Sequence, residues 1–99
     1  MKVKTDTIRK EIILVGQKDK LISRLKSRSS AFSFKDAETL LNYLGYYRSN
    51  KGKTSGSRVM FVNRENGDKI LLHKPHPRKE LLEYQIRQLI EKLEEEGLI

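Results

Sequence analysis

Apolar residues recur at helical spacing in three stretches of the chain. The clearest stretch is residues 33–45, where a serine comes first, Asp36 follows three positions later, and a glycine comes last. This arrangement predicts a helix that begins with a capping box and stops at the glycine. The apolar face of this helix consists of Ala37, Leu40, Leu41 and Leu44.

The other two stretches lie on either side of the first. A short amphipathic helix is predicted over residues 18–27, with Leu21, Ile22 and Leu25 on its apolar face. A longer helix is predicted near the C-terminus and stops at Gly97. Its apolar stripe consists of Leu82, Ile86, Leu89, Ile90 and Leu93.

Between the last two helices, residues 46–50, 57–64 and 68–74 have the composition of short β-strands. Asn66 and Gly67 separate two of them and predict a two-residue type I′ turn, because both tolerate a positive φ. That turn pairs Phe61 with Leu72 and places Arg58 diagonally across from His73. The core face of the strands is then Val59, Phe61, Ile70 and Leu72, and the other face is Arg58, Met60, Lys69, Leu71 and His73.

The order of elements predicts an α+β domain, in which a three-stranded antiparallel sheet has helices packed on one face. Ninety-nine residues suit one small core. We assign residues 18–99 to this domain and residues 1–17 to an N-terminal extension, which is either flexible or adds an edge strand. The open face of the sheet is where we expect the functional site.

The positive charge of the chain is concentrated in its first half. The net charge is +8; residues 1–58 contain 14 Lys and Arg against 5 Asp and Glu, and residues 59–99 contain 7 against 8. A polyanion such as RNA or DNA is the natural partner of such a surface, since phosphate contacts release counterions. A solvated basic surface without a partner is the alternative.

The composition also narrows the possible classes of protein. The chain has no cysteine and two histidines, so it lacks disulfides and the ligands of a structural zinc site, and we expect no metal and no cofactor. It has no apolar run of membrane-spanning length and no secretory signal pattern. We therefore expect a cytoplasmic protein.

The glycine-rich stretch before the second predicted strand carries the candidate binding residues. It reads "KGKTSGSR", which is not a P-loop because the first glycine of that motif is missing. The residues expected to contact RNA are Arg48, Lys51, Lys53, Ser55, Ser57 and Arg58. His76 lies between Pro75 and Pro77, where a contact that holds the helix entry is an alternative to a chemical role.

Three segments, "SGSRVMF", "HPRKEL" and the helix ending "EEEGLI", resemble the HicA family of toxin–antitoxin ribonucleases over roughly Lys18 to Ile99. The resemblance implies a fold like that of a double-stranded RNA-binding domain. It also implies cleavage of messenger RNA and neutralisation by a HicB antitoxin, usually encoded beside the toxin. Family members read Gly-Ser-His at the strand entry, with a catalytic histidine, whereas this chain has Arg58 after Gly56 and Ser57.

Arg58 stays protonated, so it can bind a phosphate but cannot act as a general base. RNA cleavage without a metal needs a base for the ribose 2′-hydroxyl, an acid for the leaving oxygen and a cation for the phosphorane. Our hypothesis is that His73, or else His76, supplies the imidazole while Arg58 and Lys53 hold the phosphate. The catalytic candidates are therefore Arg58, His73 and His76.

Two other functions compete with that of a nuclease. One is an RNA-binding protein of the same fold that does not cut its ligand. The other is a DNA-binding or protein-binding module, although the second helix exposes Asp36 and Glu38 rather than a basic recognition surface. Protein binding is compatible with a toxin, because an acidic antitoxin would cover the basic open face and compete with RNA.

Overall fold

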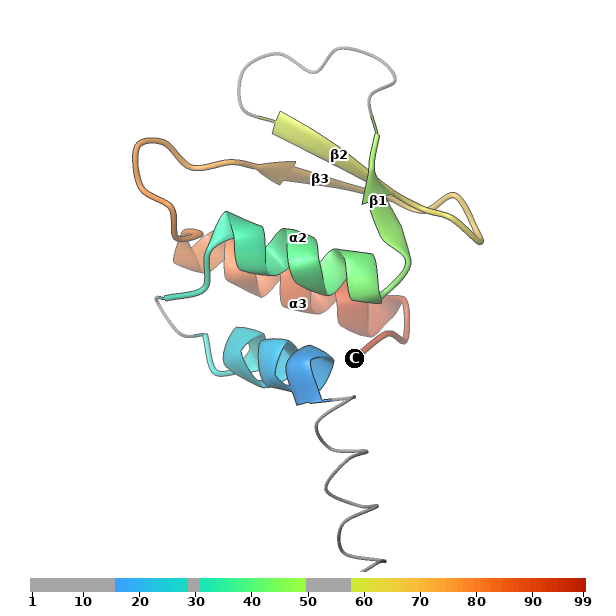
Figure 1. The fold of residues 1–99 in the computed structure, drawn as a ribbon, viewed down its shortest axis with the longest axis horizontal. Helices are drawn as coiled ribbons and strands as arrows, with labels where there is room; N and C mark the ends of the chain where they lie inside the picture. The colour runs from blue at the N-terminus through green and yellow to red at the C-terminus, as the bar shows by residue number, and fades with distance from the viewer. Residues whose placement is uncertain (1–15, 29–30, 50–57) are drawn as a thin grey trace, which may run out of the picture.

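The computed structural model describes residues 16–28, 31–49 and 58–99. A three-stranded antiparallel sheet is covered on one face by helices α2 and α3, and the helical residues 16–26 lie on the far side of these helices from the sheet (Figure 1). The α+β fold predicted from the sequence is confirmed. None of the helices in these three ranges is long and apolar enough to cross a membrane.

Helix α2, Phe34–Tyr43, begins with the predicted capping box. The Ser33 hydroxyl oxygen accepts a hydrogen bond from the Asp36 backbone N–H at 3.0 Å, and the Ser33 N–H donates to the Asp36 carboxylate at 3.1 Å. Gly45 follows the helix with a φ of 94°, a value that favours glycine. The capped start fixes the position of Phe34, the first residue of the helix.

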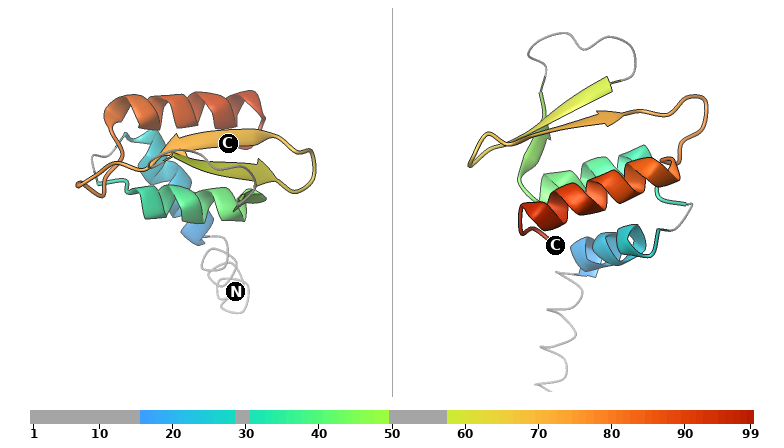
Figure 2. Two further views of the ribbon diagram at one scale, coloured as in Figure 1. Left: turned by 90° about the horizontal axis from the view of Figure 1, so that it is seen from above. Right: turned by 180° about the vertical axis from the view of Figure 1, so that it is seen from behind.

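Helix α3, Glu83–Glu95, buries most of the predicted apolar stripe. Leu82 is the N-cap, and its backbone N–H donates to the Gln85 side chain at 2.9 Å. The buried stripe consists of Ile86, Leu89, Ile90 and Leu93. Helix α3 lies on the β3 side of the sheet and α2 on the β1 side (Figure 2).

The sheet has the order β1-β2-β3, with β1 at Tyr46–Arg48, β2 at Arg58–Asn63 and β3 at Lys69–His73. The predicted register was wrong: Phe61 pairs with Ile70, and Arg58 pairs directly with His73 rather than diagonally. The shift amounts to two positions, which leaves every side chain on its predicted face. Phe61, Ile70 and Leu72 are buried accordingly.

The register differs because the loop has four residues, 64–67, instead of two. The Asn63 side-chain oxygen accepts the backbone N–H of Glu65 at 2.8 Å, and the Asn63 carbonyl accepts that of Gly67 at 2.9 Å. Asn63 and Asp68 then close the loop through a backbone hydrogen bond of 2.8 Å. Asn63 therefore stabilises a wider turn than the Asn66-Gly67 pair alone predicts.

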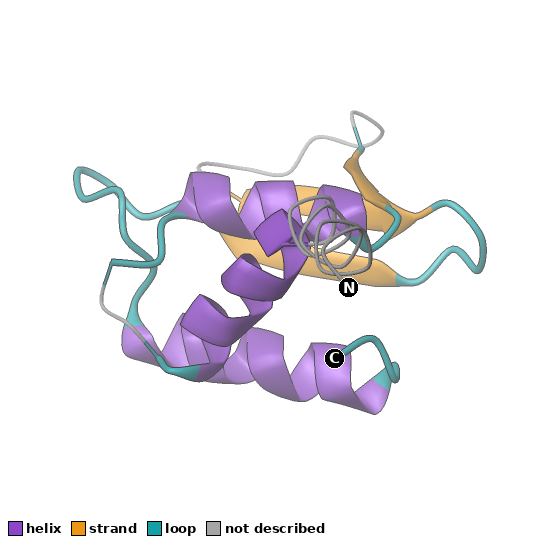
Figure 3. Ribbon diagram, turned by 60° about the horizontal axis from the view of Figure 1, so that its bottom comes forward, coloured by secondary structure: helices purple, strands orange, loops and turns teal. Residues whose placement is uncertain are grey.

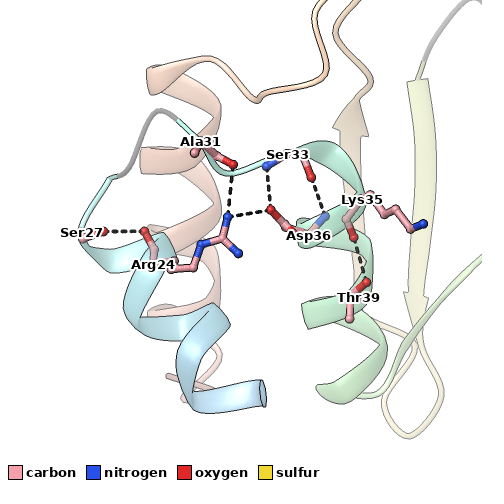
Figure 4. Close-up of polar contacts among 7 residues, drawn as sticks. All are labelled: Arg24, Ser27, Ala31, Ser33, Lys35, Asp36 and Thr39. Carbon is pink, nitrogen blue, oxygen red and sulfur yellow. Dashed lines mark hydrogen bonds and ion pairs between the residues drawn. The ribbon is translucent and has the colours of Figure 1, made fainter. Parts of the chain in front are cut away.

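The helical segment 16–26 forms a third layer. Figure 3 shows it lying across the helical layer between α2 and α3. Leu21 and Leu25 point into the core, as the apolar spacing predicts. The Arg24 guanidinium bonds the Asp36 carboxylate at 2.9 Å and the Ala31 carbonyl at 3.2 Å (Figure 4). The predicted N-terminal extension, residues 1–17, lies almost entirely outside the described residues.

A polar cluster fixes the hairpin to α3. The buried Tyr46 hydroxyl donates to the Asp68 carboxylate at 2.6 Å, and the Lys92 ammonium donates to the same carboxylate at 2.9 Å. These two hydrogen bonds lower the pKa of Asp68. Burial and the Asp68 charge raise the pKa of Tyr46, and the hydrogen bond to Asp68 raises that of Lys92.

Candidate nucleic-acid interface

Arg58 and His73 lie at one end of the sheet. Strand β2 begins at Arg58 and β3 ends at His73, and these two termini lie together (Figure 1), whereas β1 ends at Arg48 opposite Phe61, three residues further along β2. Arg58 and His73 are register partners, and both side chains are exposed on the open face. Directly opposed residues have Cβ atoms roughly 5 Å apart, close enough for both side chains to reach one phosphate.

A groove of about 510 Å³ lies beside this end of the sheet. We call it the basic groove. Its basic lining residues are Lys35, Arg48, Lys74, His76, Arg78 and Lys79. Glu38 is the acidic residue of the lining, and it is paired with the Arg48 guanidinium at 3.1 Å. The groove therefore carries a strong excess of positive charge.

The floor of the basic groove is Phe34, the first residue of α2. The Arg48 guanidinium carbon and the Lys74 ammonium each lie 5.8 Å from the centre of the Phe34 ring. Both distances suit a cation–π contact. On the core side, the Phe34 ring is 6.2 Å from that of Phe61. One buried ring thus holds two cations that come from opposite edges of the sheet.

The segment between β3 and α3 is tied to the start of α2. The Phe34 N–H donates to the Lys79 carbonyl at 3.0 Å, and the Leu81 N–H donates to the Phe32 carbonyl at 2.9 Å. A β-bridge between Ser33 and Glu80 lies between these two bonds. This pairing holds the basic residues of the sequence "HPRK" against the N-terminus of α2.

The two histidines occupy different parts of this end of the molecule. His73 lies on the open face at the end of β3, and its backbone carbonyl accepts the Gln85 side-chain N–H at 2.8 Å. His76 is exposed at the edge of the basic groove, and its peptide bond to Pro77 is cis. The structure thus brings Arg58 together with His73, and Arg48 together with His76.

The remaining candidate residues lie outside the described residues: Lys51, Lys53, Ser55 and Ser57. Conversely, the structure adds basic residues that the sequence argument missed, namely Lys35, Lys74, Arg78 and Lys79. The sequence features that could have indicated these residues are the arginine and lysine of "HPRK" and the lysine in the first turn of α2. Lys35 and Arg78 are 43 positions apart in the chain (78 − 35), so only the fold joins them.

A second hollow lies on the open face of the sheet and shares Arg48 with the lining of the basic groove. This shallow hollow of about 520 Å³ lies over β1 and β2 and includes Tyr47, Met60 and Arg64. The Arg64 guanidinium carbon lies 4.1 Å from the centre of the Tyr47 ring. Tyr46, by contrast, is buried in the core. Within the three described ranges, no three His, Asp or Glu side chains are grouped so that they could hold a metal ion.

Comparison with known families gives one match. The sequence model described as "HicA toxin of bacterial toxin-antitoxin" matches residues 34–94. The chain belongs to the HicA toxin family. The match spans the elements from α2 to nearly the end of α3, so both walls of the basic groove belong to the HicA unit. The helical segment 16–26 precedes it. Neither the curated proteins nor the solved structures include a significant match.

Proposed function

We propose that this HicA family member is a toxin that binds and cleaves messenger RNA and is neutralised by a HicB-like antitoxin. The observations that support the proposal are the Arg58–His73 pair at the end of β2 and β3 and the basic groove, whose lining includes Lys74, the residue after His73 in the chain. The first offers groups for chemistry at a phosphate, and the second offers a path for the backbone on either side of that phosphate. The proposed reaction uses no metal and no cofactor.

The binding step of this proposal rests on charge. Single-stranded RNA has one phosphate per nucleotide, and the basic groove presents five Lys and Arg side chains within about 510 Å³. Lys74 is held in place by the Phe34 ring, which lowers the entropy lost when it binds an anion, whereas Arg48, on the same ring, would have to exchange its Glu38 partner for a phosphate. Lys51, Lys53, Ser55 and Ser57 are proposed to extend this contact along the RNA.

The chemical step requires proton transfer. In our proposal the His73 imidazole removes the proton of a ribose 2′-hydroxyl, the 2′-oxygen attacks the adjacent phosphorus to form a 2′,3′-cyclic phosphate, and the P–O5′ bond breaks as the 5′-oxygen takes a proton from a water molecule. Arg58 and Lys53 neutralise the charge on the phosphorane. His76 is the alternative base. We favour His73 because it is the register partner of Arg58, whereas His76 lies at the edge of the basic groove.

The test is cleavage of RNA by purified proteins that carry His73→Ala, His76→Ala or Arg58→Ala. We expect cleavage to fall by about 100-fold or more for the histidine that acts as the base. Loss through Arg58→Ala should be partly restored by Arg58→Lys, which keeps the charge. Wild-type rates in all three alanine variants would exclude this assignment. Ser27→Ala is the control substitution, because the Ser27 hydroxyl donates to the Arg24 carbonyl and neither residue lines the groove.

A second function is favoured by one specific observation, which is that Arg58 occupies the strand entry where the family resemblance leads us to expect histidine. A toxin-like protein that binds RNA without cutting it would retain RNA with salt-sensitive affinity. It would produce no RNA fragments and cause no growth arrest when expressed without its antitoxin. The cleavage assay above distinguishes the two functions directly.

A further inference from the structure

Strand β3 is an edge strand whose outer side has backbone groups available for pairing. In the order β1-β2-β3 it has one strand neighbour, β2. The bond from the Asn63 N–H to the Asp68 carbonyl makes that pair a hydrogen-bonded one, and pairing alternates along an antiparallel ladder. Ile70 and Leu72 therefore bond to β2, whereas the N–H and carbonyl of Leu71 point away from it.

The β1 side of the sheet supports this assignment. The Met60 carbonyl accepts a hydrogen bond of 2.8 Å from the Ser49 N–H, so it points to the side of β2 on which β1 lies. Met60 is the register partner of Leu71, so the backbone groups of this pair point away from each other. Among the described residues, none bonds to the outward N–H and carbonyl of Leu71. An exposed strand edge of this kind is a template for another strand.

A groove of about 390 Å³ runs along this edge between β3 and α3. Its two ends are fixed by polar contacts: Gln85 bonds the His73 carbonyl, and Lys92 bonds the Asp68 carboxylate. Between these contacts lie the side chains of Leu71 and Tyr84, each 47% exposed. Two large apolar side chains thus flank the backbone of Leu71 on this edge of the sheet.

The charge around the edge favours an acidic partner. The residues that line the groove include Lys69, His73 and Lys92 but no Asp or Glu. Lys92 is already paired with Asp68 and Glu96, so the attraction comes from the open face, where Lys69 and Arg64 line the adjoining hollow and no Asp or Glu does. An edge that offers alternating N–H and carbonyl groups matches an extended polypeptide rather than a phosphodiester chain.

We propose that the outer edge of β3 is a docking site for an extended, acidic segment of a partner protein, which adds to the sheet as a fourth strand. Its backbone pairs with Leu71. Its acidic side chains lie on the open face near Lys69, and its alternating apolar side chains enter the groove beside Tyr84. This docking site rests on the proposed function only in the identity of the partner, which would be the antitoxin.

The experiment uses the full chain, labelled with ¹⁵N, and a capped peptide of alternating Glu and Val as the probe. Binding should shift the amide signals of Leu71 and Lys69 and slow hydrogen exchange at the Leu71 N–H. The matched control is the same peptide with N-methyl groups on one pairing edge, which keeps its charge but removes its donors. We expect that control to bind at least about tenfold more weakly.

Two variants separate backbone pairing from side-chain contact. Leu71→Pro removes the outward N–H without removing a bond to β2, and should weaken peptide binding by about tenfold or more. Leu71→Ala keeps the N–H and should have a smaller effect. Neither should change RNA binding. Equal binding of both peptides, unchanged exchange at Leu71, or shifts confined to the basic groove would overturn the proposal.

The same data keep this proposal separate from the proposed function. If the peptide binds at β3 but RNA is neither bound nor cleaved, the docking site stands and the nuclease proposal fails. If RNA is cleaved but the peptide does not protect Leu71, the docking site fails and the nuclease proposal stands.

Discussion

Removing two lysines from the basic groove should weaken RNA binding by an amount that depends on salt in a defined way. The groove contains five Lys and Arg side chains, of which Arg48 is already paired with Glu38, so about four cations are available. Each phosphate neutralised on a single strand contributes about 0.7 to the slope of log K against log salt. The expected slope is therefore about −3 for the groove.

The double variant Lys74→Ala, Lys79→Ala should reduce the magnitude of that slope by about 1.4, because two of the available cations are removed. The assay is fluorescence anisotropy of a labelled single-stranded RNA over a series of salt concentrations. Lys74 also contacts the Phe34 ring, so a thermal melt must show that the variant remains folded.

The matched control is Lys18→Ala, Lys20→Ala, which makes the same change in net charge on the helical segment 16–26. That segment lies across the helices from the sheet (Figure 1). If RNA follows the groove, the control should leave the slope within about 0.3 of wild type. An equal loss of slope in both double variants would refute the reasoning, because net charge rather than the groove would then govern binding.

Further predictions concern stability and catalysis. Tyr46→Phe removes the 2.6 Å bond to Asp68 and should lower the free energy of unfolding by about 2 kcal/mol, measured with urea. Because Tyr46 and Lys92 lower the pKa of Asp68, this carboxylate stabilises the fold above its ordinary pKa, and the stability is lost as pH falls through the folded-state pKa. A series of urea melts below about pH 4 should therefore show a steeper loss of stability in wild type than in Asp68→Asn. Leu25→Ala truncates a fully buried side chain and should cost about 3 kcal/mol, again by urea unfolding. Arg58→His introduces a titratable group at the strand entry and should raise the RNA cleavage rate near neutral pH; an unchanged rate would count against a catalytic role for that position.

The helices and the two faces of the sheet could be predicted from the sequence because their signals are local. The capping box at Ser33 and Asp36 lies within a single turn. The alternation of apolar and polar residues along β2 and β3 determines the two faces of the sheet, and a register shift of an even number of residues leaves those faces unchanged. The register could not be predicted, because it depends on the Asn63 side chain accepting backbone N–H groups of the loop. Turn residues alone do not reveal that choice.

The basic groove could not be predicted from the sequence for a different reason. Its members come from the first turn of α2, the end of β1 and the segment after β3, and no sequence pattern joins them. Arg58 and His73 were expected to lie diagonally across β2 and β3. In the structure they are direct register partners, which brings them closer together than the diagonal arrangement would. The roles of these two residues in cleavage stay a prediction.

The Phe34 ring holds Arg48 and Lys74 on one floor although they lie 26 positions apart in the chain. Folding therefore brings two cations to one ring, and because the Glu38 carboxylate offsets the Arg48 charge alone, an anion in the groove would offset the rest. Occupancy of the groove is thus coupled to folding stability: a polyanion that binds only the folded chain raises its melting temperature. An antitoxin or RNA that covers this end of the sheet would protect the toxin from unfolding while it is bound.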